Sequence, residues 1–429
     1  MKYQYLTIFC MLALLSSCTI SSKKVTDTKE YNVYLETTNA TVKEQVLEDL
    51  TFWQEKFTQT PNQFPYLSKI ASAYNKLFSI TGEIEYLHES QNVYQNLNKK
   101  TNYSNSSYLR GLAANYISQH KFKEALVLLS KAEKNGDNLE GTQKMLFDVH
   151  LELGNYKQAK SYLDKFSNDA DFDYLIRVAK WSDHRGDLNA AIKYLEQAKV
   201  KAEQSNIASS KQWIYTNLAD FYGHSGNIQA SYNHFLKALE LSPDDAYAKR
   251  GIAWIVYSHE KNPDEALRIL NTVSQTYHAP DYYLLKAEIA KFKGDLDLYQ
   301  KELESYKLAV NNSLYGDMYN TYNVMVYTET FEKLNEALVL AETEVNNRPT
   351  PQSYGLLAWT YFKQGFKRKA LKIMREHVAN QTYEPQTLLH LAEVYKANNK
   401  LKEAKILKKD LLESIFELGP LTEKDVRNI

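Results

Sequence analysis

Glycine and proline are scarce in this chain of 429 residues. Only 14 residues are Gly and 9 are Pro, whereas Gly alone makes up about 7% of an average protein. So few turn-forming residues argue against an all-β sandwich or a doubly wound sheet, because both need many tight connections. The composition therefore predicts long helices joined by short turns.

An excess of either charge is also missing. The 52 Lys and Arg residues equal the 52 Asp and Glu residues, so the formal net charge is zero. Such a chain lacks the overall positive charge with which nucleic-acid-binding proteins attract phosphates. We therefore expect no nucleic acid among its partners. The hydrophobic content of 44% is that of a folded protein.

Cysteine is confined to Cys10 and Cys18, close to the N-terminus. Lys2 precedes an apolar run from Tyr5 to Leu15, which is too short to cross a bilayer. A positive residue, a short apolar run and small residues at Ser16 and Ser17 are typical of a signal peptide. The sequence therefore predicts a signal peptide over residues 1–17.

The order Leu15-Ser16-Ser17-Cys18 resembles the lipobox of bacterial lipoproteins. That resemblance implies cleavage before Cys18 and lipidation of this residue with several acyl chains, palmitate among them, which is enough for stable anchoring. With Cys18 blocked, the mature chain has no free thiol. This excludes disulfides, a cysteine nucleophile and cysteine metal ligands. The alternative is an ordinary secretory peptide with a chance cysteine.

The stretch TISSKKVTDTKE that follows Cys18 is polar and shows no periodicity, and it opens the segment 18–40. We interpret this segment as the lipidated Cys18 followed by a flexible tether. Thr19 follows Cys18. An Asp at that position resembles the inner-membrane retention signal of enterobacterial lipoproteins, so its absence favours the outer membrane. The expected location is the bacterial cell envelope, with the protein held by its N-terminal lipid.

A pattern of small and aromatic residues repeats along most of the chain. Its ten anchors are separated by nine steps, so the mean spacing is (404 − 90)/9, about 34.9 residues. The anchors are Ser90, Ala125, Ala159, Ala191, Ser231, Ala266, Tyr299, Ala337, Ala370 and Ala404.

This spacing resembles that of the tetratricopeptide repeat, a helix–turn–helix unit. The fifth copy carries the family pattern well, with Leu218, Ala219, Tyr222, Ser231, Phe235, Ala238 and Pro243. The resemblance implies an all-α fold, a superhelical solenoid of about ten tetratricopeptide-like repeats over residues 64–418. Stacking is obligatory because a single helix pair cannot bury its own apolar face.

Gly or Asn recurs five residues before six of the anchors. These residues are Gly154, Gly186, Gly226, Gly294, Gly365 and Asn399. Both residue types tolerate the left-handed backbone that ends a helix. Each therefore predicts the turn between the first and the second helix of a repeat. Small residues such as Ala358 and Ala370 predict close approach of the two helices.

The ends of the chain depart from the repeat. A capping-box pattern at Thr41–Glu44 precedes an apolar stripe at helical spacing, which predicts an N-terminal capping helix over residues 41–63. Residues 419–429 are expected to form a frayed C-terminal tail. Two wide steps between anchors predict longer loops near residues 202–211 and 311–316.

Motifs that carry chemistry are missing from the sequence. There is no G-x-x-x-x-G-K-[ST], G-x-G-x-x-G, H-E-x-x-H or G-x-S-x-G pattern. We expect no enzymatic activity, no cofactor and no metal site. His184, His224 and His259 share one position in three consecutive repeats. We interpret them as surface residues near turns, with a pH-sensing or metal-binding role as the alternative.

Aromatic residues occupy groove-facing positions of the first helix in the eighth and ninth repeats. These candidates for partner binding are Tyr319, Tyr322, Trp359 and Phe362. Tyr and Trp are favoured at binding hot spots, although in a Tyr-rich chain such residues can also pack on one another. The favoured function is a membrane-anchored, non-catalytic scaffold that binds a peptide or protein in the solenoid groove. The alternative is a glycan-binding outer-membrane lipoprotein of a nutrient uptake system.

The first prediction concerns Cys18. Labelled palmitate should enter the wild-type protein and not Cys18→Ala, because the sulfur and the new N-terminus at this residue are the acceptors that the lipobox resemblance implies. The measurement is metabolic labelling followed by gel autoradiography. Label that persists in Cys18→Ala would contradict the lipoprotein prediction.

Overall fold

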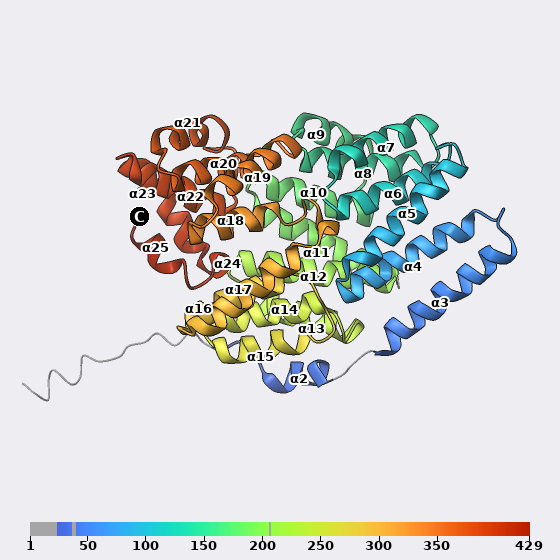
Figure 1. Ribbon diagram of the computed structural model, residues 1–429, viewed down its shortest axis with the longest axis horizontal. Helices are drawn as coiled ribbons and strands as arrows, with labels where there is room; N and C mark the ends of the chain where they lie inside the picture. The colour runs from blue at the N-terminus through green and yellow to red at the C-terminus, as the bar shows by residue number, and fades with distance from the viewer. Residues whose placement is uncertain (1–23, 37–39, 206) are drawn as a thin grey trace, which may run out of the picture.

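The computed structural model describes residues 24–36, 40–205 and 207–429, and the described residues contain helices but no strand (Figure 1). The α-helices are α2 (Thr28–Glu36), α3 (Ala40–Gln59), α4 (Pro65–Thr81), α5 (Ile84–Lys100), α6 (Ser106–Ser118), α7 (Phe122–Asn135), α8 (Leu139–Glu152), α9 (Tyr156–Lys165), α10 (Phe172–His184), α11 (Leu188–Ser205), α12 (Ala208–His224), α13 (Ile228–Leu241), α14 (Ala246–Trp254), α15 (Pro263–Val273), α16 (Asp281–Lys293), α17 (Leu296–Val310), α18 (Asn320–Thr330), α19 (Leu334–Asn347), α20 (Pro351–Lys363), α21 (Lys367–His377), α22 (Pro385–Ala397), α23 (Leu401–Glu413), α24 (Ile415–Leu418) and α25 (Glu423–Arg427). A π-helical turn, Ile255–His259, extends α14.

Consecutive helices from α4 to α23 pack as ten antiparallel pairs, and the pairs stack into a superhelical solenoid. The predicted fold class and the expected number of about ten repeats are therefore confirmed. Among the described residues, no helix has both the length and the apolar character to span a bilayer.

Each of the ten pairs turns through one residue with a positive φ angle. Six of these residues are the predicted Gly and Asn positions, with φ between 58° and 90°. The other four are Gly82, His120, Lys261 and Phe331. His120 and Lys261 also lie five residues before their anchors, but neither residue type signals a left-handed turn, so the sequence pattern missed them. The register of the repeat, more than the residue type, determines where the chain turns.

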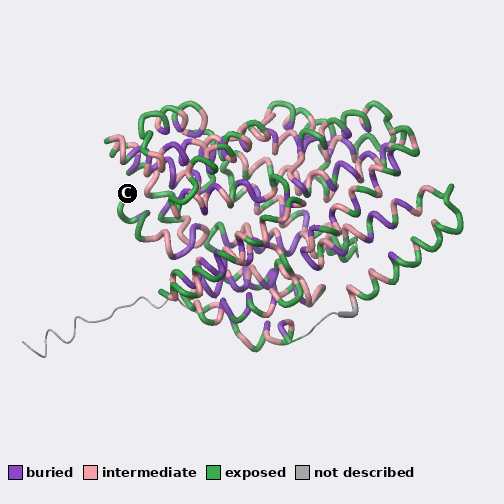
Figure 2. Tube along the Cα trace, in the orientation of Figure 1, coloured by how far each residue is buried: buried purple, intermediate pink, exposed green. Residues whose placement is uncertain are grey.

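Small anchor residues form the contact between the two helices of each pair. Ala358 and Ala370 are completely buried, and the nine Ser and Ala anchors are at most 1% exposed. Close approach at these positions lets the larger side chains fill the layers between pairs. Figure 2 shows short buried segments along the stacked helices, alternating with intermediate and exposed ones.

Successive turns of the solenoid touch one another. Arg348 Nη1 lies 3.4 Å from Glu152 Oε2, a contact between residues 196 positions apart. Dividing this separation by a repeat length of about 35 residues gives between five and six repeats per superhelical turn. At Gly154 a Cβ atom would lie only 2.9 Å from the carbonyl oxygen of Pro349, so the two turns meet there without room for a side chain.

Further contacts between turns lie at both ends of the solenoid. The His278 amide donates to the Thr81 carbonyl at 2.8 Å. The carbonyl of Phe416, on α24, accepts bonds from Trp254 Nε1 at 3.0 Å and Ser258 Oγ at 2.7 Å. Figure 1 shows α24 beside α12, where the C-terminal helices reach the middle of the chain. The groove expected from the repeat is thereby narrowed to a central channel that stays open to solvent.

The flexible tether expected up to residue 40 is wrong for the described residues 24–36. Here α2 packs against α13 and α15, on the outside of the solenoid. Tyr31 is 1% exposed and Leu35 is 7% exposed, and both belong to the core of the fifth and sixth pairs. Burying an apolar side chain of this size stabilises the docked helix by about 1.5–3 kcal/mol. The polar residues just before this pair, such as Lys29 and Glu30, concealed the apolar face of the helix.

The C-terminal tail is also more ordered than expected. Residues 423–427 form α25, which packs on α23, and Val426 is completely buried. The predicted wide loop near residues 202–211 is replaced by longer helices, since α11 extends to Ser205 and α12 begins at Ala208. Near residues 311–316 the connection holds a 3-10 turn, Ser313–Tyr315. The capping helix expected at residues 41–63 overlaps α3, which packs on α4.

The second prediction tests the contact within a helix pair. Ala358→Trp should destabilise the protein by about 1–3 kcal/mol or more, because overpacking a contact without free volume forces helices apart. The matched control is Val339→Trp on α19, where the side chain is 62% exposed. Thermal melting followed by circular dichroism measures both. Equal melting temperatures for the two variants would contradict the close packing at Ala358.

Candidate functional site

The central channel has a volume of about 1230 Å³ and is lined mainly by the first helix of several repeats. Its walls come from α8, α10, α14, α16, α18, α20 and α22, together with α24, α25 and residues of α9 and α17. Lys180 and Asp183, groove positions of the fourth repeat, are among the lining residues. The first helices thus face inwards, as the repeat implies.

The structure separates the four predicted groove aromatics into two groups. Tyr322 and Trp359 line the channel, whereas Tyr319 and Phe362 do not. Tyr319 precedes the first residue of α18 and is only 9% exposed. It packs in a buried cluster with Tyr306 and Tyr315. Phe362 is half-buried against Trp359, with ring centroids 5.3 Å apart.

Among the aromatic side chains that line the channel, Tyr322 is the most available to a ligand. It is 42% exposed and lies beside Tyr319, with ring centroids 5.7 Å apart. Arg250 and Asp281 are close to its hydroxyl group, and burial raises the pKa of Tyr322. Arg250 Nη2 and Asp281 Oδ2 are 3.8 Å apart. The Tyr322 ring therefore lies next to an arginine and an aspartate that compensate each other's charge.

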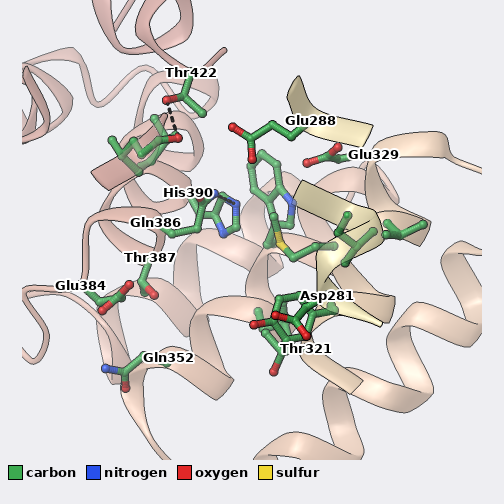
Figure 3. A pocket seen from close by; sticks show the side chains of 18 of the residues that line it. Asp281, Glu288, Thr321, Glu329, Gln352, Glu384, Gln386, Thr387, His390 and Thr422 are labelled. Carbon is green, nitrogen blue, oxygen red and sulfur yellow. Dashed lines mark hydrogen bonds between the residues drawn. The ribbon is translucent and has the colours of Figure 1, made fainter. Parts of the chain in front are cut away.

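Trp359 is part of the channel wall but is only 5% exposed. Its indole stacks on the imidazole of His390 at 4.0 Å, with 6° between the planes. Burial and the charge of Lys363 lower the pKa of His390 to about 3, so this ring is neutral. Its Nε2 lies 2.9 Å from Gln386 Nε2 and accepts a hydrogen bond from it (Figure 3). Trp359 thus has one face occupied, as a packing residue does.

In the channel, carboxylates without an ion-pair partner outnumber lysines and arginines without one. Some lining charges are paired, such as Arg348 with Glu152 at 3.4 Å and Arg250 with Asp281. Within the described part of the chain, six lining carboxylates make no ion pair, against two lysines, Lys291 and Lys363. The six are Asp183, Glu288, Glu329, Glu384, Glu393 and Asp425. Both lysines lie over aromatic rings, those of Tyr299 and Trp359.

The environment of these acids weakens their ionisation. Burial raises the pKa of Glu288 to about 7, and Glu329 adds to this, although the Tyr257 hydroxyl donates a bond to Glu288 at 3.0 Å. Burial likewise raises the pKa of Glu384 to about 7, and the charge of Glu417 adds to it. Figure 3 shows Glu288 and Glu329 on one side of the channel and Glu384 on the other. A positive ligand charge between them would relieve the cost of keeping them ionised.

Sequence reasoning found part of this site. Tyr322 and Trp359 follow from the register of the first helices. Glu384 and Asp425 were missed, because the former precedes α22 and the latter lies in the segment expected to fray. No sequence pattern marks these two residues. Only the tertiary structure brings them to the channel, where a later turn of the solenoid meets an earlier one.

Metal binding has no support in the described residues, which bring no group of three or more His, Cys, Asp or Glu together for a metal ion. The three aligned histidines have separate surroundings. His184 packs on Tyr156 at 4.2 Å, whereas His224 Nδ1 lies 3.9 Å from Glu417 Oε2. Cys18, the predicted lipidation site, lies outside the described residues.

The third prediction concerns pH and the contact between turns. Glu417 lies on α24, and burial, with the nearby charge of Asp183, raises its pKa to about 7. In the unfolded chain the value is about 4.3. The folded protein therefore binds this proton more tightly, so the stability that Glu417 contributes is present below about pH 4.3 and is lost as the pH rises to about 7.

We expect Glu417→Gln to melt higher than the wild type at about pH 8 and to lose part of the fall in melting temperature between about pH 5 and pH 8. Glu413→Gln, at an exposed position on α23, is the control. Melting curves at several pH values measure the effect. An unchanged pH dependence in Glu417→Gln would show that this carboxyl group does not weaken the junction.

Comparison with known proteins gives one family match. Residues 214–245 match the model described as Tetratricopeptide repeat, and this range corresponds to α12 and α13. No curated protein matches the chain.

Several solved structures are similar to this chain at low sequence identity. The chain is 17% identical to Pseudomonas aeruginosa pilF, with a TM-score of 0.37, over 50% of this chain and 96% of that one. It is 12% identical to yeast Tom70, with a TM-score of 0.37, over 94% and 95%. It is 18% identical to a human IFIT1 dimer with PPP-AAAA, with a TM-score of 0.39, over 76% and 80%. The chain thus contains a tetratricopeptide repeat at residues 214–245, within a solenoid of ten helix pairs.

Proposed function

We propose that this protein is a membrane-anchored, non-catalytic scaffold that binds an extended, basic segment of a partner protein in its central channel. The observation that carries the proposal is the channel itself, an apolar and aromatic passage surrounded by carboxylates without ion-pair partners. A tetratricopeptide-type solenoid is usually an interaction module, which agrees with a protein partner.

The dimensions of the channel favour a chain segment over a small molecule. Pockets for small ligands usually have volumes of about 300–1,000 Å³, and this channel has about 1230 Å³. Its walls come from repeats far apart in the sequence, so a ligand within it would contact many helices at once. An extended peptide can make such contacts along its length.

The charge of the channel favours a basic ligand. Six unpaired carboxylates face two unpaired lysines, although the whole chain is neutral. Lys or Arg side chains would compensate these carboxylates, while apolar groups of the peptide would contact Tyr322 and Leu284. The same excess of unpaired carboxylates disfavours nucleic acids, since binding to phosphates needs an excess of Lys and Arg. We therefore keep the expectation of a protein partner.

The lipid anchor supplies the location in this proposal. Cys18 would carry the lipid, and Thr19 in place of Asp favours the outer membrane of a bacterial envelope. A glycan ligand has less support. Sugar stacking needs exposed aromatic faces, and Trp359 is 5% exposed with one face on His390. Of the two predicted aromatics that line the channel, only Tyr322 offers an exposed ring.

The fourth prediction tests the channel as the binding site. The probe is a fluorescent peptide of alternating Lys and Leu, with a Glu-for-Lys peptide of the same length as its counterpart. Fluorescence anisotropy should show binding of the basic peptide only. Tyr322→Ala should weaken this binding by about 2 kcal/mol without a lower melting temperature, because an exposed hot-spot residue contributes to binding more than to folding.

Trp359→Ala should instead melt several degrees lower, because its removal leaves a cavity against His390. Phe52→Ala is the matched control, since Phe52 is 47% exposed on α3 and does not line the channel. Unchanged peptide affinity in a stable Tyr322→Ala protein would remove Tyr322 from the site. Preference for the acidic peptide, or for a single-stranded RNA probe, would contradict the proposed ligand class.

A further inference from the structure

The N-terminal segment that follows the proposed lipid site is fastened to one face of the solenoid. The backbone amides of Val25 and Thr26 donate to Glu260 Oε1 at 2.8 and 2.7 Å. The Thr26 hydroxyl donates to Glu260 Oε2 at 3.1 Å, and Thr26 is 4% exposed. One carboxylate thus binds two successive backbone amides and a hydroxyl group.

Helix α2 continues this attachment. The Tyr31 hydroxyl donates to Glu265 Oε1, and Arg268 Nη2 donates to Asn32 Oδ1, both at 2.6 Å. The Tyr232 hydroxyl donates to Glu30 Oε2 at 2.9 Å. Several specific bonds and a buried apolar face together distinguish this arrangement from a loose contact.

The chain between Cys18 and the attachment is short. Only five residues, 19–23, separate Cys18 from Lys24. Whatever conformation they adopt, six Cα-to-Cα steps span at most about 22 Å. A lipid on Cys18 therefore cannot lie far from the start of the docked segment.

From these observations we infer that the face formed by α2, α13 and α15 is held against the lipid surface, so that the solenoid has one fixed orientation on the membrane. This inference rests on the lipid anchor of the proposed function. Figure 1 shows α2 and α15 along one edge of the molecule and α7 and α21 along the opposite edge. The edge with α7 and α21 is the one that faces away from the membrane and towards soluble partners.

Single cysteines can report this orientation, because Cys10 and Cys18 are the only native ones. A donor dye on Asn271→Cys, at an exposed position of α15, reports the near edge. Dyes on Lys372→Cys in α21 and Val127→Cys in α7 report the far edge, where the side chains are 74% and 70% exposed. The full-length lipidated protein is reconstituted in phosphatidylethanolamine–phosphatidylglycerol vesicles that carry an acceptor dye on their headgroups.

Energy transfer to the headgroups should be at least about twofold stronger from position 271 than from positions 372 and 127, because the short connection holds α15 near the lipid. A variant with about 20 Gly and Ser residues inserted after Ser22 keeps the docked segment and adds roughly 25 Å of flexible chain. In this variant the ratio should fall towards one. Each labelled protein must keep the wild-type melting curve.

The experiment distinguishes a failure of the proposed lipid anchor from a failure of the inferred orientation. If the Cys18→Ala protein still associates with vesicles as the wild type does, the proposed lipid anchor fails. If the wild type needs Cys18 for association but transfers energy equally from all three positions, or more strongly from position 372, the anchor stands and the orientation is wrong. A ratio that stays high in the spacer variant would show that another contact, not the short connection, orients the protein.

Discussion

The contact between successive turns of the solenoid is the constraint on which the other features depend. Helix pairs of this kind stack because each leaves an apolar face that it cannot bury alone. Here the stack winds so tightly that Glu152 meets Arg348, and Gly154 meets the carbonyl oxygen of Pro349. An open superhelix would present a groove to solvent. In this one the C-terminal helices contact α12 and the end of α14, which narrows the groove to a channel.

Burial in the channel changes the ionisation of its acidic side chains. Asp183, Glu384 and Glu417 come from α10, the start of α22 and α24, and only the contact between turns brings them together. Burial raises the pKa of all three carboxyl groups, and the charge of Asp183 adds to this at Glu384 and Glu417. The protein therefore gathers carboxyl groups without cationic partners inside, although its sequence is neutral overall. This combination agrees with selective binding of a basic segment and is poorly suited to a phosphate backbone.

The N-terminal segment shows how a polar stretch can be ordered by a few well-placed contacts. Tyr31 and Leu35 insert into the core of the fifth and sixth pairs, and Glu260 accepts the amides that begin the segment. These contacts join sequence positions more than 200 residues apart. Only five residues separate Cys18 from the start of the docked segment, so the anchor proposed at Cys18 would favour one face of the solenoid.

The sequence alone determined the repeat, the all-helical fold and six of the ten turns. A period of about 35 residues, small anchors such as Ala370 and left-handed positions such as Gly365 are local features, so their spacing along the chain is enough to reveal them. Tertiary structure decided the curvature of the superhelix, because that depends on small rotations added over many pairs. It thereby decided that Tyr322 faces the channel while Tyr319 is buried, and that Glu384 joins the site. It also decided that residues 24–36 dock, since their partners Tyr232, Glu260 and Glu265 are distant in sequence and leave no periodic signal.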